Sequence, residues 1–282
     1  MKTNPTSTLI TRLLFIVFTL FFSSTAFASN NKPVRIVSLG LCTDQLLLMM
    51  GEKKNIASLT TRVTDPLMSY MAEFADDIPL NNASVEEVIP FHPDLVVASR
   101  FASQDTVRML KQLGYRVELM DLPTRVEDIY SLIDTFGRWI GEPENADRMI
   151  KKMKKDILEI QERNAHKPPK NAIIYSPNGY TIGAQTLEND VLKKSGYSNI
   201  SETIGIQHFQ KISLELLIQS KPDVLLIDNH VYNKNSLASK HLVHPVLKTI
   251  VPEQRQLFIP SRLRACPGPM TVEAIAYLAD NR

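Results

Sequence analysis

Short apolar runs alternate with amphipathic segments along most of the chain. The runs are rich in valine, isoleucine and leucine, which is typical of buried parallel strands, and in the first half they lie at 35–39, 55–59, 94–98 and 115–120. Segments with helical spacing lie between them at 46–50 and 107–113, and Gly51 and Gly114 end these segments. Strands that alternate with helices predict βαβ crossovers and a mainly parallel sheet.

A different pattern covers residues 143–165. Apolar side chains recur there at spacings of three and four, and most positions between them are charged; the apolar positions are Ala146, Met149, Ile150, Met153, Ile157 and Ile160. This spacing predicts one long amphipathic helix, and Pro143 suits its first turn. At 1.5 Å per residue, about 20 residues would span roughly 30 Å, which is the width of a small domain. We therefore expect this helix to link two halves of the chain.

The alternation of strands and helices resumes after residue 170. Strands are predicted at 171–175, 223–228 and 256–259, and helices at 187–194 and 271–279. The expected fold class is α/β, with two Rossmann-like lobes, mainly parallel sheets and one long rigid helix that joins them. The expected organisation is an N-terminal lobe over 29–142, the linking helix over 143–165 and a C-terminal lobe over 166–282.

The first 28 residues have the pattern of a cleavable secretory signal peptide. Lys2 and Arg12 precede an apolar core at 13–22, and Ala26-Phe27-Ala28 gives the small-x-small pattern that a signal peptidase accepts. A membrane-spanning helix needs about 20 apolar residues, so this core is too short for one. No cysteine follows the core at the usual position of a lipid attachment. We therefore expect residues 1–28 to be removed and the mature chain to be free in the periplasm.

Charge and motif content narrow the function classes. Without residues 1–28 the chain has 30 basic and 30 acidic residues, because Lys2 and Arg12 are two of its 32 basic residues. A nucleic-acid-binding chain normally has a basic excess, and none is present here. The sequence contains no Gly-x-Ser-x-Gly elbow, no P-loop and no dinucleotide fingerprint, so we expect no enzyme. A periplasmic hydrolase with an unrecognised site stays open as an alternative.

An internal repeat relates the two halves. Residues 84–89 (SVEEVI) and 93–97 (PDLVV) recur 129 residues later as 213–218 (SLELLI) and 222–226 (PDVLL). Serine, glutamate, isoleucine, proline and aspartate fall at the same offsets in both copies. Each copy predicts a serine-capped short helix, a turn at the proline and a buried parallel strand. The repeat therefore supports two equivalent lobes.

The repeated glutamates, Glu86 and Glu215, have two interpretations. An acid in the first turn of a helix interacts favourably with the helix dipole, by roughly 0.3–1 kcal/mol. Ser84 and Glu87 can also form a capping box, which is a purely structural role. The other interpretation is that one glutamate at the tip of each lobe forms a pair of docking points for a partner. The repeat by itself leaves both interpretations open.

With these features the chain resembles the helical-backbone class, or class III, of periplasmic substrate-binding proteins, which serve ABC importers of siderophores, haem and cobalamin. The resemblance rests on residues 35–39 (RIVSL), on the Ser-x-Glu and Lys/His-Pro-Asp units of both halves, and on the long helix near 144–164. It covers the mature chain and implies a ligand cleft between the lobes, limited hinge motion, a monomer and no catalysis. It also implies that Glu86 and Glu215 pair with arginines of a permease dimer in the inner membrane.

Loops after the predicted strands supply the candidate ligand contacts, because ligands of open α/β sheets lie beyond the carboxyl ends of the strands. Arginine offers forked donors for carboxylate or phosphate, and tyrosine offers a flat face with a polar tip, so both suit an anionic or aromatic chelate. The candidates are Cys42, Thr43, Arg62, Arg100, Tyr175, Tyr180, Arg262 and Arg264, with Thr61, Phe101, Asn229 and His230 in the same loops. Each arginine could instead be a solvated loop residue or the partner of a nearby acid. Tyr175 could instead be a core residue.

The two cysteines, Cys42 and Cys266, are 224 residues apart and both fall in predicted cleft loops. An even number of cysteines in an oxidising compartment favours a disulfide, which would here restrain the opening of the lobes. Two separate thiols are the alternative, because sequence spacing does not give the distance between the Cα atoms.

The expected ligand is a metal chelate, a ferric siderophore first and a corrinoid next, and we expect no covalently bound cofactor. The preference for iron rests on Trp139, the single tryptophan, which lies in a helical pattern, whereas cobalamin pockets of the family often contain tryptophan. Haem, another metal chelate or a free metal ion stay open. His241 and His244 are three residues apart, but Pro245 follows them, and no Cys-x-x-Cys or His-Glu-x-x-His occurs. We therefore assign no metal ligands.

Overall fold

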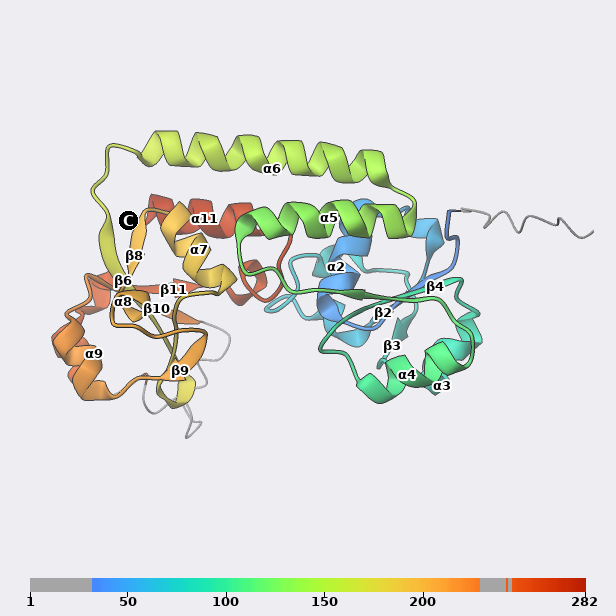
Figure 1. The fold of residues 1–282 in the computed structure, drawn as a ribbon, viewed down its shortest axis with the longest axis horizontal. Helices are drawn as coiled ribbons and strands as arrows, with labels where there is room; N and C mark the ends of the chain where they lie inside the picture. Colours follow the sequence, from blue (N-terminus) through green and yellow to red (C-terminus); the bar gives the residue numbers. More distant parts are fainter. Residues whose placement is uncertain (1–31, 229–241, 243–244) are drawn as a thin grey trace, which may run out of the picture. The chain divides into compact units, whose positions relative to one another are not determined.

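A computed structural model describes residues 32–228, 242 and 245–282 (Figure 1). The signal peptide expected over 1–28 and the candidates Asn229, His230, His241 and His244 lie outside this described part. Residues Pro33–Arg282 form one compact unit, which contains two α/β lobes and a long helix. Each helix among the described residues is too short or too polar to span a bilayer.

The N-terminal lobe is built on a parallel sheet in the order β3-β2-β1-β4-β5. Successive side chains of a strand point to opposite faces, and both faces are buried here, since Ile36 and Val37 belong to two different core clusters. This burial on both faces explains the continuous apolar runs in the sequence. The strands are β1 (Ile36–Ser38), β2 (Ile56–Thr60), β3 (Leu80–Asn81), β4 (Leu95–Ser99) and β5 (Val117–Met120), and the helices are α2 (Leu41–Met50), α3 (Val85–Val88), α4 (Gln104–Gln112) and α5 (Val126–Ile140).

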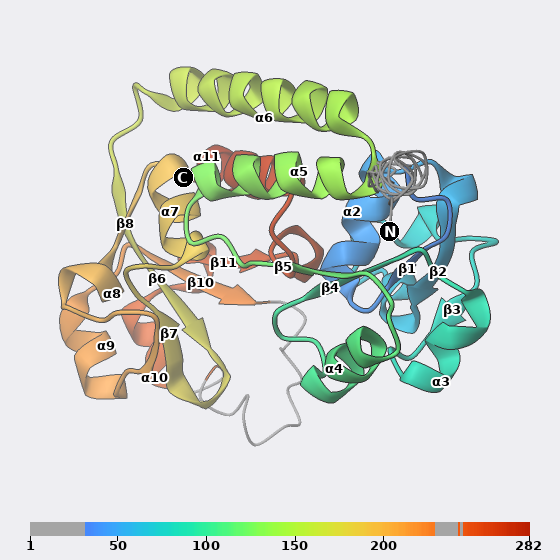
Figure 2. The same ribbon diagram turned by 45° about the vertical axis from the view of Figure 1, so that its right-hand side comes forward.

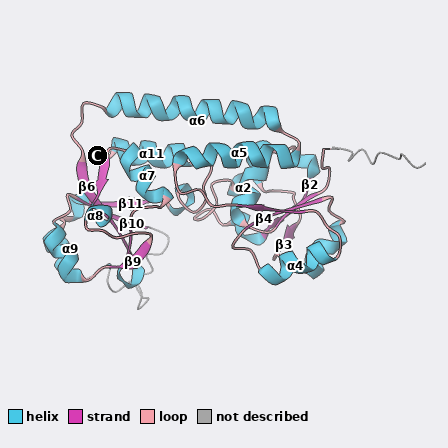
Figure 3. Cartoon of the chain, in the orientation of Figure 1, coloured by secondary structure: helices cyan, strands magenta, loops and turns pink. Residues whose placement is uncertain are grey.

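The C-terminal lobe has a mixed sheet in the order β11-β10-β6-β7-β9, with β8 beside β6. Its core pairs are parallel, and only β6–β7 and β7–β9 run antiparallel among the described strands. Helices lie on both sides of the strands in each lobe (Figure 3), so the expected α/β fold class with mainly parallel sheets is confirmed. The strands are β6 (Lys170–Ser176), β7 (Tyr180–Ile182), β8 (Tyr197–Asn199), β9 (Phe209–Lys211), β10 (Val224–Asp228) and β11 (Gln256–Ile259), and the helices are α7 (Leu187–Lys194), α8 (Ile200–Thr203), α9 (Leu214–Ser220), α10 (Pro245–Ile250) and α11 (Thr271–Asp280).

The predicted long helix is α6 (Pro143–Asn164), which lies along α5 of the N-terminal lobe and α11 of the C-terminal lobe (Figures 1 and 2). Its apolar stripe serves both lobes in turn. Met153 packs into a core cluster of the N-terminal lobe, and Ile157, one turn later, packs into a cluster of the C-terminal lobe. The helix is therefore part of both cores and not a free linker.

The internal repeat forms the same capped helix in each lobe. Ser84 caps α3 by accepting from the N–H of Glu87 at 3.3 Å, and Ser213 caps α9 by accepting from the N–H of Leu216 at 3.2 Å. The predicted capping box is only half formed, because the Glu87 carboxylate accepts from the N–H of Asn82 and not from that of Ser84. The local reason is that the chain bends back at Asn82 before the cap.

The second part of the repeat ties each buried strand to its neighbour. Asp94 and Asp223, which directly precede β4 and β10, accept from backbone N–H groups at the start of the adjacent strands β1 and β6. The bonds run from Arg35 N to Asp94 Oδ1 at 3.1 Å and from Asn171 N to Asp223 Oδ2 at 2.8 Å. The repeated aspartates are therefore structural and set the alignment of two central strands in each lobe.

Candidate functional site

A pocket of about 530 Å³ lies beyond the carboxyl ends of the N-terminal strands. Its described lining comes from the segments that follow β1, β2, β3 and β4, and from Ala265 and Cys266 of the C-terminal lobe. This is where an open α/β sheet places its ligand, and the volume lies in the usual range of about 300–1,000 Å³ for ligand pockets. A cavity inside the C-terminal lobe has a volume of only about 40 Å³.

The walls of the pocket are set by short polar turns at the strand ends. The side chain of Asn81 is 1% exposed, and its Nδ2 donates to the carbonyl oxygens of Ser38 at 3.2 Å and Leu59 at 3.0 Å. These bonds hold the end of β3 against β1 and β2, and they bring Asn82 and Ala83 to the pocket wall. Ala83 is in the left-handed region (φ 60°), which is costly for a residue with a Cβ and is concentrated at functional sites in proteins.

An exposed cation and a buried acid contribute charge close to the pocket. Arg62 lines the pocket and is exposed. Asp44, in the first turn of α2, is fully buried and accepts from the N–H of Thr60 at 3.0 Å. Burial raises the pKa of Asp44 to about 6, although hydrogen bonds with Ser38 and Thr60 act in the opposite direction. The negative charge beneath the pocket therefore appears only as the pH rises through about 6.

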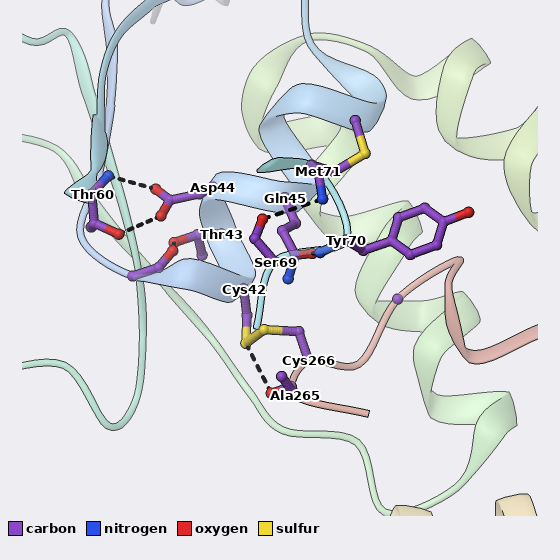
Figure 4. The surroundings of a disulfide bond; sticks show 12 residues. Cys42, Thr43, Asp44, Gln45, Thr60, Ser69, Tyr70, Met71, Ala265 and Cys266 are labelled. Carbon is purple, nitrogen blue, oxygen red and sulfur yellow. Dashed lines mark hydrogen bonds between the residues drawn. A yellow bond between two sulfur atoms is a disulfide. The ribbon is translucent and has the colours of Figure 1, made fainter. Parts of the chain in front are cut away.

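A disulfide joins the two lobes at the edge of this pocket (Figure 4). It links Cys42, in the first turn of α2, to Cys266, and the two Cα atoms are 5.1 Å apart. The Sγ of Cys42 also lies 3.7 Å from the carbonyl oxygen of Ala265. Of the two alternatives that the sequence leaves open for these cysteines, the structure has the disulfide.

The described lining of the pocket is mostly apolar and neutral polar. Among the described residues of the pocket wall there is no imidazole, phenol or carboxylate. Nor do the described residues anywhere contain a group of three or more His, Cys, Asp and Glu side chains that could hold a metal ion. The wall offers the Arg62 guanidinium, small polar groups and apolar surface, including the Phe101 ring, which is 78% exposed. Such a mixture of apolar surface and a few polar groups is typical of small-molecule pockets.

Of the eight ligand contacts predicted from the sequence, Cys42 and Arg62 belong to the pocket wall, together with the neighbouring Thr61 and Phe101. Thr43 and Tyr175 do not, because their side chains are buried. Thr43 is 0% exposed and donates to the carbonyl oxygen of Gly40 at 2.9 Å. The expectation that Thr43 contacts the ligand is therefore wrong, since its position in the first turn of α2 points its hydroxyl back to the strand end.

Tyr175 belongs to the core of the C-terminal lobe. It is 1% exposed and packs in the cluster on one face of β6, so the prediction of a ligand contact is wrong and the alternative of a core residue holds. The strand extends one residue beyond the predicted range at each end, so that Tyr175 lies inside β6 and not at its end. Burial also raises the pKa of its phenol.

The remaining four candidates also lie outside the described wall of the pocket. Arg100 is exposed and pairs with Asp121, and Tyr180 is 40% exposed with Lys211 Nζ 5.5 Å from its ring centroid. Arg264 turns inward, where its Nη2 is 3.9 Å from Glu188 Oε1. Arg262 is exposed and close enough to Tyr70 for its charge to lower the pKa of that phenol, against the stronger effects of burial and Glu273.

The predicted docking residues occupy equivalent places. Glu86 and Glu215 are both exposed, and each is the second residue of a serine-capped helix, α3 in one lobe and α9 in the other. The pKa of Glu215 is lowered by its own backbone N–H and by the Ser213 hydroxyl, so its carboxylate is held ionised. The geometry is compatible with both interpretations of the repeat.

Several pocket residues were missed by sequence reasoning. Asn82 and Ala83 follow β3, which is two residues long and therefore has no apolar pattern that could reveal it. Met68 lies on a long irregular connection between β2 and β3. Ser103 and its neighbours could have been found from the sequence. A serine before the predicted 107–113 helix marks the start of α4, so the turn between β4 and α4 lies at the strand ends.

Comparison with curated proteins finds relatives among substrate-binding proteins. An uncharacterised ABC transporter substrate-binding lipoprotein of Bacillus subtilis is 28% identical over 216 residues, which cover 73% of this chain and 67% of the relative. A cobalamin-binding protein of Halobacterium salinarum is 23% identical over 208 residues, which cover 72% of this chain and 56% of the relative. The chain thus matches little more than half the length of the second relative.

Solved structures share the fold at low sequence identity. The periplasmic haem-binding protein RhuT of Roseiflexus sp. RS-1 in apo form has a TM-score of 0.74 and 20% identity, over 88% of this chain and 98% of that protein. The periplasmic vitamin B12-binding protein BtuF of Vibrio cholerae has a TM-score of 0.68 and 14% identity, over 89% of this chain and 96% of that protein. At these identities the likeness is one of fold.

The family match covers most of the described structure. A family model described as periplasmic binding protein matches residues 36–249, which is more than half of the chain, and it confirms the resemblance seen in the sequence. The family consists of extracytoplasmic substrate-binding proteins of transport systems and not of enzymes. This chain belongs to the periplasmic binding protein family.

Proposed function

We propose that the chain is the substrate-binding protein of an ABC importer for a metal chelate, with a ferric siderophore as the first candidate and a corrinoid as the second. The observation that carries the proposal is the pocket of about 530 Å³ at the carboxyl ends of the N-terminal strands, bordered by a segment of the other lobe. In its proposed mature form, residues 29–282, the protein is a periplasmic monomer whose lobes, 29–142 and 166–282, flank the helix at 143–165.

The chemistry of the pocket wall supports a chelate whose own donors satisfy the metal. The described wall lacks imidazole, phenol and carboxylate groups, and Met68 supplies a single thioether, so the wall holds few of the side chains that ligate haem iron or a bare metal ion. Arg62 can form paired hydrogen bonds with carboxylate or phosphate groups on the periphery of such a ligand. The exposed ring of Phe101 offers an apolar face for its organic part.

A corrinoid is the second candidate because of the relatives. The Halobacterium salinarum protein is named as cobalamin-binding, and the Vibrio cholerae protein as vitamin B12-binding. A corrinoid supplies four nitrogen donors to its cobalt, so it meets the same condition of a metal bound mostly by its own ligand.

The ligand class is tested with the purified mature chain and three named probes. Ferrichrome, cyanocobalamin and haemin are titrated separately by isothermal calorimetry, and each mixture is examined by native mass spectrometry. We expect a 1:1 complex with ferrichrome or cyanocobalamin, and we expect an Arg62→Ala variant to weaken it about tenfold, which corresponds to about 1.4 kcal/mol. Binding of haemin alone would refute the ligand class, and binding of none would refute the proposal of a chelate.

For the importer, we propose that Glu86 and Glu215 are the docking points for the permease. Both carboxylates are exposed on equivalent helices of the two lobes, and neither takes part in an ion pair among those found for the described residues. A pair of exposed charges is suited to meeting arginines on a partner, because rim charges steer association and fix its orientation.

Docking is tested by transport in cells that depend on the bound chelate. The variant with Glu86→Gln and Glu215→Gln should bind the chelate with unchanged affinity and lose transport by at least tenfold. Glu144→Gln is the matched control, because Glu144 is also an exposed acid in the first turn of a helix, α6, but lies outside the repeat. Equal transport by the double variant and the control would show that the repeated glutamates serve only their helices.

A further inference from the structure

One face of α2 makes the contact between the N-terminal lobe and the segment 265–273 of the C-terminal lobe. Cys42, Gln45 and Met49 are spaced three and four residues apart, so they lie on the same side of this helix. Cys42 forms the disulfide with Cys266, and Met49 lines a second pocket of about 360 Å³ together with Met270. The disulfide is thus the end of a packed seam that runs along α2.

The seam is tight around the disulfide. A Cβ placed on Gly268 would lie 3.6 Å from the Cδ2 of Leu46 and 2.9 Å from the Sδ of Met270. On the same face of α2, the Oε1 of Gln45 accepts from the N–H of Tyr70 at 2.7 Å (Figure 4). The segment after Cys266 is therefore packed on itself at Met270 and lies in van der Waals reach of Leu46 on α2.

The disulfide also fixes the part of the C-terminal lobe that reaches the ligand pocket. The C-terminal residues in the described wall are Ala265 and Cys266, that is, one half of the disulfide and the residue before it. The N-terminal half of the bond, Cys42, is in the same wall. The position of the C-terminal wall relative to Arg62 and Phe101 therefore depends directly on this covalent bond.

Other hydrogen bonds and an ion pair join the lobes away from the pocket. The Tyr70 hydroxyl donates to Glu273, and the Lys194 ammonium pairs with Glu127 at 2.7 Å. The N–H of Val126 donates to an aspartate of α7 at 2.8 Å. None of these residues belongs to the described wall of the ligand pocket. With the shared core of α6, these ties keep the lobes together without the disulfide, so the bond has a role that is local to the pocket.

We propose that the Cys42–Cys266 disulfide is a positioning element of the ligand pocket: it holds Ala265 and Cys266 as the C-terminal wall opposite Arg62. This inference rests on the proposed function of the pocket. The bond does not contact the metal of the ligand, and no redox step is part of the proposal. Its effect is to remove in advance the conformational freedom that the 260–270 segment would otherwise lose on binding.

Hydrogen exchange measured by mass spectrometry tests the positioning role without a ligand. The mature protein is compared with a Cys42→Ser, Cys266→Ser variant and with wild-type protein reduced by a phosphine under native conditions, which needs no refolding. We expect exchange to rise at least tenfold in peptides that cover 39–43 and 261–270, and to stay unchanged in β6, β10 and α6. Reoxidation of the reduced protein should restore the protection.

A control separates this local effect from a general loss of stability. Gly137→Ala disturbs the packing of α5 on α6 and on Met50, at the opposite end of α2 from Cys42, and it should raise exchange without selecting the peptides at 39–43 and 261–270. If removal of the disulfide gives the same spread pattern as Gly137→Ala, or no change at 261–270, the positioning role is wrong.

Binding supplies the second readout. With whichever of ferrichrome and cyanocobalamin binds the wild type, the double serine variant should bind at least tenfold more weakly at a temperature where it is fully folded, and equal affinity would overturn the inference. If neither probe binds the wild type, the proposed function fails, whereas the exchange pattern still decides whether the bond positions the 261–270 segment.

Discussion

The buried acid Asp44 should make the stability of this protein depend on pH in an unusual direction. Its side chain is fully buried in the first turn of α2, and burial raises its pKa from 3.8 to about 6. In the unfolded chain the group has its ordinary pKa, so between about pH 4 and 6 the folded state binds more protons than the unfolded state. The contribution of Asp44 to stability is therefore fully present below the unfolded pKa and is lost as the pH rises through about 6.

The magnitude follows from the size of the shift. A change of about two pKa units corresponds to about 3 kcal/mol, because each unit is worth about 1.4 kcal/mol. Asp44→Asn removes this titration and keeps the shape, since the amide oxygen can accept from the N–H of Thr60 and the amide nitrogen can donate to its hydroxyl. The free energy of unfolding of the wild type minus that of the variant should thus fall by about 3 kcal/mol between pH 3.5 and 7.5.

Urea unfolding with the disulfide intact measures this difference at a series of pH values. Trp139, the single tryptophan, lies on α5 of the same lobe and reports its unfolding by fluorescence. Asp76→Asn is the control, because Asp76 is exposed and the same change from carboxylate to amide there leaves the buried Asp44 in place. A flat difference for Asp44→Asn would show that the buried carboxylate is not protonated near pH 6 and would refute the reasoning.

Two further predictions concern packing and the repeat. Gly137→Ala should lower the free energy of unfolding by about 1–3 kcal/mol, because the added Cβ would lie 2.6 Å from the Cβ of Ala146 on α6. This cost should exceed the gain from the higher helix propensity of alanine. A variant that is more stable in urea unfolding would contradict this packing. Asp94→Ala and Asp223→Ala should each cost about 1 kcal/mol, and their effects should add, because the residues serve strands in different lobes; thermal unfolding of the single and double variants checks both statements.

Much of the fold was predictable because burial on both faces of a parallel sheet leaves a plain pattern. The runs at 94–98 and 223–228 became β4 and β10, and the spacing over 143–165 became α6. The elements that were not predicted are short or lie at the edge of a sheet. The clearest example is β9, whose residues Phe209–Lys211 are all exposed, so that no apolar period marks them as a strand.

The candidate site was predictable by place but only partly by residue. The rule that ligands lie beyond the strand ends pointed to the loop of Arg62 and the turn of Cys42, and both line the pocket. It could not tell which side chains of a loop turn outward. Arg264 turns toward Glu188, and Thr43 turns back toward the end of β1, because each finds a partner inside its own lobe.

The sequence by itself determined the α/β class, the two related lobes, the spanning helix and the position of the exposed glutamates Glu86 and Glu215, since these depend on periodicity and on patterns within one segment. Only the tertiary structure decided that Cys42 and Cys266 are bonded, that Tyr175 is core, and that the described part of the pocket wall belongs mostly to the N-terminal lobe. The physical reason is distance: local pattern follows from neighbours a few residues apart, whereas bonding, burial and pocket walls depend on which segments, up to 224 residues apart, the fold brings into contact.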